Sequence, residues 1–435
     1  MASHHPRPIF ESRLDRRTLL RGLGGGAAAL AAAPLLAACS GGPAPAAAGA
    51  NATSLGSGLS DPVPRSAVQA MVDAFKAKSG ATVKMNVMPR AQLVDNISSY
   101  LQSNPEDVIT WYAGYKMRYY AAKGLLAPVD DVWEKIGGNF SEGITKASEG
   151  EDGHKYFVPN YNYPWGFYYR KSLWAERGYE VPATFDAFLS LCVQMKKDGL
   201  IPIAFADKDG WPAMGTFDYI NMRTNGYQFH LDLCAHKESW DQQKVKDVFD
   251  NWKALLPYQD PAALGATWQE GARSMTGKKS GMYLIGAFIA QDVTDKEILA
   301  DLDFFPFPAI AVEGTDAIEA PIDGFVLSKR AASNKTAKDM VAFFGTGAGQ
   351  DAYAAKDSSN MQTAKDANTS SFSELNKKGA EAIAGAKFIS QFFDRDALPA
   401  MANNVMIPAL QGFIKDGTID TRTIEAQATS LYAAE

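Results

Sequence analysis

The chain is poor in cysteine and histidine for its 435 residues. Three cysteines, Cys39, Cys192 and Cys234, are too few for a disulfide framework, although one bond between Cys192 and Cys234 stays open. The five histidines form no H-E-x-x-H motif or paired cluster, and no Cys/His spacing is typical of a zinc site. We therefore expect neither a metal nor a cofactor.

Motifs of common enzyme classes are also missing. The stretch 271–280 departs from the P-loop pattern, because Lys279 stands where Ser or Thr is required. Gly345, Gly347 and Gly349 follow a predicted helix and not a strand, which excludes a dinucleotide fingerprint. No G-x-S-x-G elbow is present. The sequence predicts a binding protein and not an enzyme, although a glycosidase with two facing carboxylates stays open.

Charge of one sign is not concentrated in this chain. Acidic residues number 49 and basic residues 43, which gives a net charge of -6. A weakly acidic protein has no general electrostatic reason to bind nucleic acid or an anionic membrane. We expect no nucleic-acid partner.

The first 38 residues have the composition of a secretory signal peptide. An uncharged run, 22–38, rich in Ala, Gly and Leu, follows a basic region and ends in small residues before Cys39. A membrane-spanning helix is the alternative, but the run is slightly short and dominated by Gly and Ala. The arginines of the basic region are Arg7, Arg13, Arg16, Arg17 and Arg21.

Two shorter stretches of this region resemble known export signals. Leu36-Ala37-Ala38-Cys39 resembles the bacterial lipobox, which implies cleavage before Cys39 and acylation of its thiol. The stretch 15–21 is similar to the twin-arginine signal but departs from it at Asp15 and Leu19, so the general export route stays open. Residues 39–50 predict a flexible tether. We expect an exported chain that touches the outer face of the cytoplasmic membrane only through lipid on Cys39.

Helical and strand-like patterns alternate through the rest of the chain. A helix is predicted at 65–80, where Gly80 would cap the end, and another at 184–198, with Thr184 as N-cap and Cys192 in its core stripe. Alternation of this kind indicates an α/β fold with a parallel sheet between helices, and the length suggests two lobes. Further helices are predicted at 92–103 and 337–344, and strands at 83–87, 107–111, 165–169, 281–285 and 325–328.

Large aromatic residues gather where predicted strands end. Three stretches, 110–114, 161–166 and 209–212, combine Trp or Tyr with Gly, Pro or Asp at such positions. Ligands of open α/β sheets bind just beyond the strand ends. A sugar suits such a site, because its C–H face packs on a ring and its hydroxyls take fixed hydrogen-bond partners.

Several segments in order resemble the family 1 extracellular solute-binding proteins, the sugar receptors of bacterial ABC importers, here of actinomycete type. The resemblance covers nearly the whole chain beyond the tether. It rests on the segments 106–111, 124–130, 167–173 with 181–185, 275–278 with 281–286, and 321–325.

The resemblance implies a two-lobed, type II periplasmic-binding-protein-like fold with a mostly parallel sheet in each lobe and the ligand in the cleft. Its lobes would close on the sugar like a hinge. It also implies a monomer that delivers a sugar to a membrane permease: a monosaccharide such as galactose or glucose, or else a short oligosaccharide. The predicted parts are lobe I at 51–160 with 320–346, lobe II at 163–306 with 361–435, and crossovers near 160–162, 307–320 and 346–361.

Carried over residue by residue, the resemblance places five side chains in the cleft: Tyr112, Trp165, Trp211, Phe288 and Asp323. Loop position adds Arg90, Tyr163, Asp209 and Trp268. Asp323 has the alternative role of capping a turn before Gly324, and Arg90 that of a solvated charge. Core roles are expected for Trp133, Trp174, Trp240 and Trp252. A secreted glycoside-active enzyme and a protein-binding lipoprotein adaptor are the rival functions.

Overall fold

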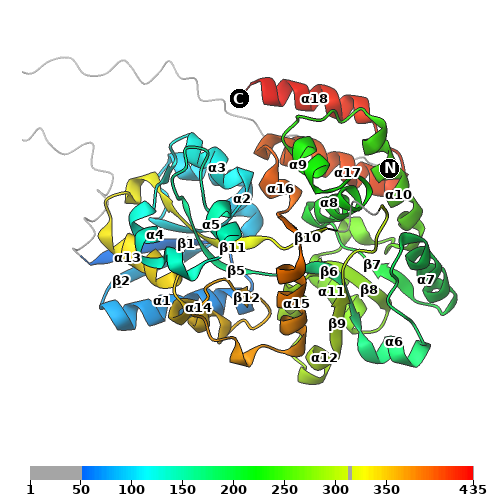
Figure 1. The fold of residues 1–435 in the computed structure, drawn as a ribbon, viewed down its shortest axis with the longest axis horizontal. Helices are drawn as coiled ribbons and strands as arrows, with labels where there is room; N and C mark the ends of the chain where they lie inside the picture. The colour runs from blue at the N-terminus through cyan, green and yellow to red at the C-terminus, as the bar shows by residue number, and fades with distance from the viewer. Residues whose placement is uncertain (1–50, 312–315, 435) are drawn as a thin grey trace, which may run out of the picture. The chain divides into compact units, whose positions relative to one another are not determined.

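The computed structural model describes residues 51–311 and 316–434. The predicted signal peptide, the predicted lipid-anchor residue Cys39 and the whole predicted tether lie outside the described residues. The described chain contains two large sheets and one short two-stranded ribbon, with helices around them (Figure 1). We call the elements of the seven-stranded sheet and its helices lobe I, and those of the four-stranded sheet and its helices lobe II.

The sheet of lobe I combines parallel and antiparallel strands. Its parallel part joins β1 (Ala52–Ser57) to β2 (Thr82–Val87) and β3 (Val108–Tyr112). The strand β11 (Ile322–Ser328) then runs antiparallel between β3 and β5 (Phe157–Asn162). The two remaining strands are β4 (Leu126–Ala127), beside β11, and β12 (Met361–Gln362), beside β5.

Local sequence explains the first helix of lobe I. The helix α1 (Pro62–Ser79) begins three residues before the predicted start, because Pro62 fits the first helical turn. It ends at Gly80, whose φ of 67° is the left-handed value that glycine adopts readily. Its buried face carries Val68, Met71, Val72 and Phe75, the stripe that the sequence predicts.

The sheet of lobe II has the order β7-β8-β6-β9. Only β7 (Ile201–Ala204) and β8 (Ser280–Gly286) are parallel, whereas β6 (Trp165–Arg170) is antiparallel to β8 and to β9 (Leu302–Phe305). The α/β fold class is confirmed, but both sheets are mixed and not mostly parallel. Strands that enter or leave a lobe at the crossovers run against their neighbours, which explains the difference.

The predicted core of lobe II is buried as expected. The side chain of Thr184 caps α7 (Phe185–Lys197) by accepting a hydrogen bond from the backbone N–H of Ala187 at 3.3 Å. Cys192 and Cys234 are both buried and carry free thiols. The four tryptophans with expected core roles, Trp133, Trp174, Trp240 and Trp252, are at most 7% exposed.

Three segments connect the lobes. β5 leads into β6, and β10 (Ala317–Glu319) pairs in parallel with β13 (Phe388–Ser390) to form the two-stranded ribbon. The range predicted for the third crossover, 346–361, contains α14 (Gly347–Ala354), which packs against α1 and α13 of lobe I, and β12 after it still pairs with β5, so the third connection begins beyond β12. Figure 1 shows α13 and α14 beside the much earlier α1.

The remaining helices cover both sheets. Those of lobe I are α2 (Arg90–Gln102), α3 (Tyr115–Ala122), α4 (Asp130–Ile136), α5 (Glu142–Ala147) and α13 (Lys335–Phe344). Those of lobe II and its C-terminal part are α6 (Lys171–Arg177), α8 (Trp211–Asn225), α9 (Tyr227–Cys234), α10 (Gln243–Leu255), α11 (Trp268–Thr276), α12 (Lys296–Asp301), α15 (Glu374–Gly385), α16 (Phe393–Asp396), α17 (Ile407–Asp416) and α18 (Thr421–Ala433).

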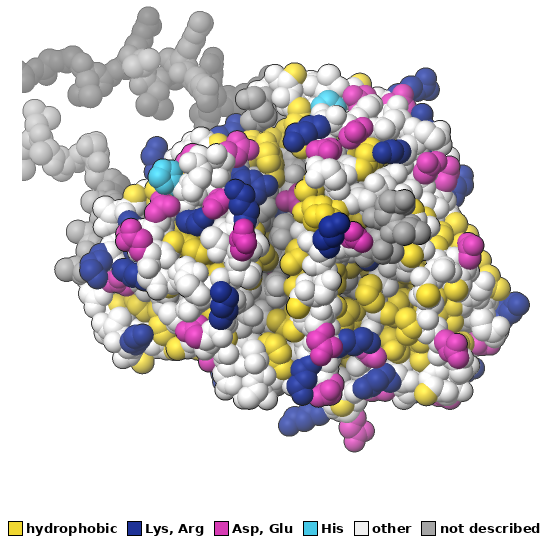
Figure 2. Space-filling view, viewed as in Figure 1, with side chains coloured by type: hydrophobic (Ala, Val, Ile, Leu, Met, Phe, Trp, Pro, Cys, Tyr) yellow, Lys and Arg dark blue, Asp and Glu magenta, His cyan; other side chains and the backbone are white. Residues whose placement is uncertain are grey.

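The surface carries charges of both signs. Figure 2 shows acidic and basic side chains interspersed over the face that it presents. Over the described ranges, no helix combines the length and the hydropathy that crossing a membrane would require.

Candidate functional site

The strand β11 carries a buried carboxylate into the centre of the lobe I sheet. Sheet register places Asp323 opposite Tyr112 of β3 on one side and Tyr161 of β5 on the other. Asp323 therefore lies within a strand and does not cap a turn, which corrects the alternative drawn from the sequence. The register shifts immediately after it at Gly324, where a Cβ atom would lie 2.1 Å from the carbonyl oxygen of Val158. Only glycine permits this close approach of β5.

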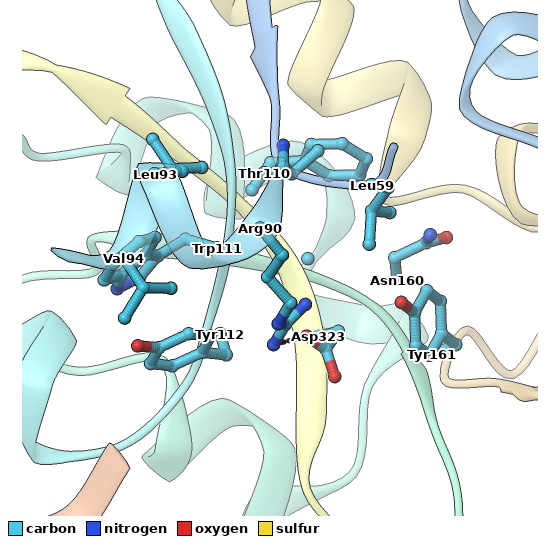
Figure 3. A pocket seen from close by; sticks show the side chains of 13 residues that line it. Leu59, Arg90, Leu93, Val94, Thr110, Trp111, Tyr112, Asn160, Tyr161 and Asp323 are labelled. Atoms are coloured by element: carbon cyan, nitrogen blue, oxygen red, sulfur yellow. Dashed lines mark hydrogen bonds and ion pairs between the residues drawn. The ribbon is translucent and has the colours of Figure 1, made fainter. Parts of the chain in front are cut away.

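Arg90, at the start of α2, reaches the Asp323 carboxylate. Its guanidinium lies 3.5 Å from Asp323 Oδ1 and 5.6 Å from the centre of the Tyr112 ring. The Arg90 side chain is 45% exposed, whereas that of Asp323 is 6% exposed. Figure 3 shows the guanidinium pointing toward Asp323, with Tyr112 and Tyr161 on either side. Arg90 is therefore paired and not simply a solvated charge.

A second arginine, the buried Arg395 of α16, is also paired with Asp323. Its guanidinium nitrogens donate to Asp323 Oδ2 at 3.3 Å and to the Tyr163 hydroxyl at 3.2 Å. The guanidinium also lies 4.5 Å from the centre of the Tyr112 ring. Burial alone lowers the pKa of Arg395, but the charge of Asp323 and the Tyr163 hydroxyl outweigh it and raise the pKa above the usual range. Arg90, Asp323 and Arg395 form what we call the charged cluster.

The aromatic residues predicted for the cleft also come together. Phe288, which follows β8, lies with its ring centre 5.2 Å from that of Trp268, 6.0 Å from that of Trp211 and 6.1 Å from that of Trp165. Trp165 is fully buried, whereas Trp211, Trp268 and Phe288 are half-buried. These four rings form what we call the aromatic cluster.

Tyr163 links the two clusters. Its ring centre lies 5.3 Å from that of Phe288, nearly perpendicular to it at 89°, while its hydroxyl accepts the hydrogen bond from Arg395. Phe392 lies beside the same contact, 4.8 Å from the Trp165 ring and 5.0 Å from the Arg395 guanidinium. The structure thus brings charges and aromatic faces to one place.

Local backbone geometry places Trp211 and Trp268 at helix starts. Trp211 follows Gly210, whose φ of 79° is left-handed and whose Cβ atom, if present, would lie 2.6 Å from the Ile407 side chain. Trp268 follows Thr267, which forms a capping box with Glu270 and fixes the start of α11. Both indoles are therefore presented from rigid helix ends.

Asp209 takes a different position from the other predicted residues. It is exposed, and it acts electrostatically on Asp61 of lobe I. Burial raises the pKa of Asp61, Arg90 opposes this, and Asp209 adds to it. Asp61 also accepts a hydrogen bond at 3.3 Å from Gln269 of α11, so it connects lobe I to lobe II near the clusters.

Several buried polar atoms near the clusters have unused hydrogen-bonding capacity. Trp165 Nε1, the Tyr112 hydroxyl and Asn160 Oδ1 are buried and make no hydrogen bond with any described residue. Beneath Arg90, between residues that include Leu59, Leu93 and Asn160, lies a cavity of about 20 Å³. That volume holds about one water molecule.

Comparison with known proteins shows the family. The family described as bacterial extracellular solute-binding protein matches residues 60–351. The chain belongs to this family.

Solved structures of similar proteins share the whole described fold. The chain is 41% identical to the bacterial solute receptor AcbH, with a TM-score of 0.85 over 88% of this chain and 99% of that one. AcbH is described as having an exclusive preference for β-D-galactopyranose. The GacH receptor of Streptomyces glaucescens shares the fold at 16% identity, with a TM-score of 0.72 over 88% of this chain and 98% of that one.

Curated relatives match over shorter regions. An uncharacterized ABC transporter extracellular-binding protein of Pyrococcus horikoshii is 25% identical over 57% of this chain and 56% of its own length. A probable sugar-binding periplasmic protein of Mesorhizobium japonicum is 28% identical over 36% of this chain and 38% of its own length. The chain thus spans about half or less of the length of these relatives.

Membership of this solute-binding protein family confirms the predicted family, the two-lobed fold and a binding function in place of catalysis. The roles of individual side chains stay predictions. Sequence reasoning missed Arg395 and Phe392. The only signal was the segment 392–396, in which two aromatic residues precede an arginine between two aspartates.

Proposed function

We propose that this solute-binding protein is the sugar receptor of an ABC importer and that its ligand is a monosaccharide, with galactose first and glucose second. A short oligosaccharide is the alternative ligand. The observation that carries the proposal is the meeting of the charged cluster with the aromatic cluster. Ring faces suit the C–H face of a pyranose, and ionic groups suit its hydroxyls. Similarity to the galactose receptor AcbH supports galactose.

Within this proposal, each cluster has its own task. Trp165, Trp211, Trp268 and Phe288 supply the apolar faces. Asp323, oriented by Arg395, accepts hydrogen bonds from sugar hydroxyls, and Arg90 donates to a hydroxyl from the accessible side. Tyr112 and Tyr163 frame the charged cluster, and Asp209 contributes at the exposed edge.

Entry of a sugar requires a change of conformation. The cavity under Arg90 holds about one water molecule, so a pyranose ring does not fit the site as described. We therefore propose that the lobes separate about their connecting segments to admit the ligand and then close on it.

The proposed setting is the outer face of the cytoplasmic membrane. Lipid on Cys39 and the tether 39–50 would hold the receptor near its permease, a separate membrane protein. The receptor would act as a monomer, since one pair of lobes makes a complete site.

Calorimetric titration of residues 40–435 with a panel of mono- and oligosaccharides tests the proposal. We expect one-to-one binding of galactose, with recovery of the unaltered sugar afterwards. Binding of no sugar in the panel would overturn the sugar assignment, and recovery of a cleaved sugar would favour a glycoside-active enzyme. Tight binding of an oligosaccharide alone would replace the monosaccharide by the alternative ligand.

A further inference from the structure

Two carboxyl groups lie together in the interior beside the segments that connect the lobes. Asp218 on α8 and Glu319 on β10 are both 0% exposed, and the backbone N–H of Glu319 donates to the hydroxyl of Tyr219, the residue after Asp218, at 3.3 Å. No N–H or O–H group of any described residue donates to Asp218 Oδ1 or to either carboxyl oxygen of Glu319. A carboxyl group donates a hydrogen bond only when it is protonated. A proton held between the two groups would supply a donor to the oxygens that have none.

The surroundings do not compensate a second negative charge here. The titratable and charged groups that face the pair are Tyr219 and Arg223 of α8, His230 and Cys234 of α9, and Asp394, Arg395 and Asp396 of α16. His230 Nε2 lies 3.8 Å from Asp218 Oδ1, but burial lowers the pKa of this imidazole to about 4, so it is neutral near pH 7. Arg395 acts on Glu319 but is already paired with Asp323.

The same pair fastens both chain segments that deliver the charged cluster. Asp218 Oδ2 accepts a hydrogen bond from the backbone N–H of Phe393 at 2.7 Å, two residues before Arg395. Glu319 lies four residues before Asp323 on the run from β10 to β11. Asp218 thus lies where the two segments meet, beside the β10–β13 pairing and the hydrogen bond that the Ile322 N–H donates to Gln391 Oε1 at 2.9 Å.

We propose that Asp218 and Glu319 share one buried proton and that this bridge positions Asp323 against Arg395 in the sugar site. Both are positioning residues, since neither is among the side chains that we propose to contact the sugar. The role rests on the proposed sugar-binding function, whereas the shared proton itself does not.

Loss of the proton would weaken the contact of β10 with α8. Burial raises the pKa of both carboxyl groups, and Asp218 raises that of Glu319 further, whereas the Phe393 N–H and Glu319 partly oppose the rise for Asp218. At alkaline pH the pair becomes doubly negative in a dry environment, and repulsion moves β10 away from α8. Affinity for the sugar is then expected to fall as pH rises, by at most about tenfold per pH unit for one proton.

The decisive variant is Glu319→Gln, whose amide donates to Asp218 at every pH. Titration with D-galactose should show that the Kd of the wild-type chain rises with pH on the alkaline side, by at most about tenfold per pH unit. In Glu319→Gln the Kd should vary less than about threefold over the same range. Glu176→Gln, a matched change at an exposed acid on α6, should retain the wild-type profile. A rise of Kd with pH that is equal in wild type and Glu319→Gln would overturn the positioning role.

An infrared measurement without sugar tests the shared proton separately. The C=O band of a protonated carboxyl group should be present in the wild-type chain at about pH 7, weaker by one group in Glu319→Gln, and unchanged in Glu176→Gln. No difference between wild type and Glu319→Gln would overturn the shared proton. If the band behaves as expected but no sugar binds at any pH, the proposed function fails and the positioning role fails with it, while the shared proton stands. Should Glu319→Gln not fold, Asp218→Asn replaces it, because its amide donates to Glu319.

Discussion

The charged cluster and the aromatic cluster meet in one place but are built in opposite ways. Members of the charged cluster depend on one another, since the buried Arg395 has Asp323 as its counter-charge and Asp323 lies between two arginines. The rings of the aromatic cluster are each held by their own element, and three of the four remain half-buried. A charge removed from the first cluster should therefore disturb the fold and the site together. A ring removed from the second should disturb mainly the site.

The largest effect is expected for Asp323→Ala. This change leaves the Arg395 guanidinium buried without its carboxylate, which costs about 3–5 kcal/mol for a broken buried ion pair. We expect galactose binding to be lost and the free energy of unfolding, measured by urea titration, to fall by about that amount. Asp209→Ala, at an exposed acid, is the control and should change the unfolding free energy by less than about 0.5 kcal/mol. Equal stabilities of Asp323→Ala and wild type would show that the charged cluster is not interdependent.

Asp207, near the aromatic cluster, differs from Asp323, because its carboxyl group forms no ion pair with any described residue. It is 0% exposed, its Oδ1 accepts one backbone hydrogen bond from Ala213 at 2.7 Å, and its Oδ2 has no partner among the described residues. Burial raises the pKa of Asp207 to about 7. The folded chain therefore binds this proton more tightly than the unfolded chain does. The contribution of Asp207 to the free energy of unfolding is fully present below about pH 4 and is lost as pH rises to about 7.

We expect Asp207→Asn to remove this part of the pH dependence of the unfolding free energy. Between about pH 4 and pH 7 the unfolding free energy of the wild type should fall, relative to that of the variant, by up to about 4 kcal/mol. Urea unfolding at several pH values measures the difference. Parallel pH curves for the two chains would mean that Asp207 is stabilised as a carboxylate, like Asp323.

Trp211→Ala tests the aromatic cluster, where we expect an effect on the site more than on the fold. Loss of a half-buried ring that we propose faces the sugar should weaken galactose binding by about tenfold to a hundredfold, as for other tryptophan contacts at binding sites. The unfolding free energy should change much less, because the indole is already partly solvated. Trp240→Phe is the matched control, since Trp240 is fully buried in the core of lobe II. It should lower the melting temperature and leave the Kd unchanged, and the reverse pattern would contradict the division between site and core.

The smallest effect is expected for Arg90→Ala. The Arg90 side chain is 45% exposed, so solvent screens its ion pair with Asp323, and such pairs contribute about 0–1 kcal/mol. Galactose affinity, measured by calorimetry, should fall by about twofold to fivefold, with a smaller loss at high salt. A loss as large as that of Asp323→Ala would mean that Arg90 supplies a main polar contact to the sugar and not a minor, solvent-screened one.

Local sequence rules predicted much of the fold. Gly80 ends α1 and Thr184 begins α7 because glycine and threonine have specific roles at helix ends, and these roles depend on a few neighbouring residues. Trp165 and Trp211 were also predictable, since they lie beside turn residues at strand ends, whereas Phe288 was expected from the family resemblance and Trp268 from its loop position. Arg395 was not, because its role depends on Asp323, which is 72 positions away in sequence. The mixed direction of the strands likewise follows from the path between lobes, which no local pattern records.

The two buried cysteines have a practical consequence for studying motion. Burial raises the pKa of the Cys192 thiol to about 12 and that of Cys234 well above its usual value, so neither is a thiolate near pH 7. A chain that starts at Ser40 has no other cysteine. Maleimide dyes should therefore react only with cysteines introduced on the surface. One such label on each lobe would allow the opening and closing of single molecules to be followed by energy transfer, with the native core left intact.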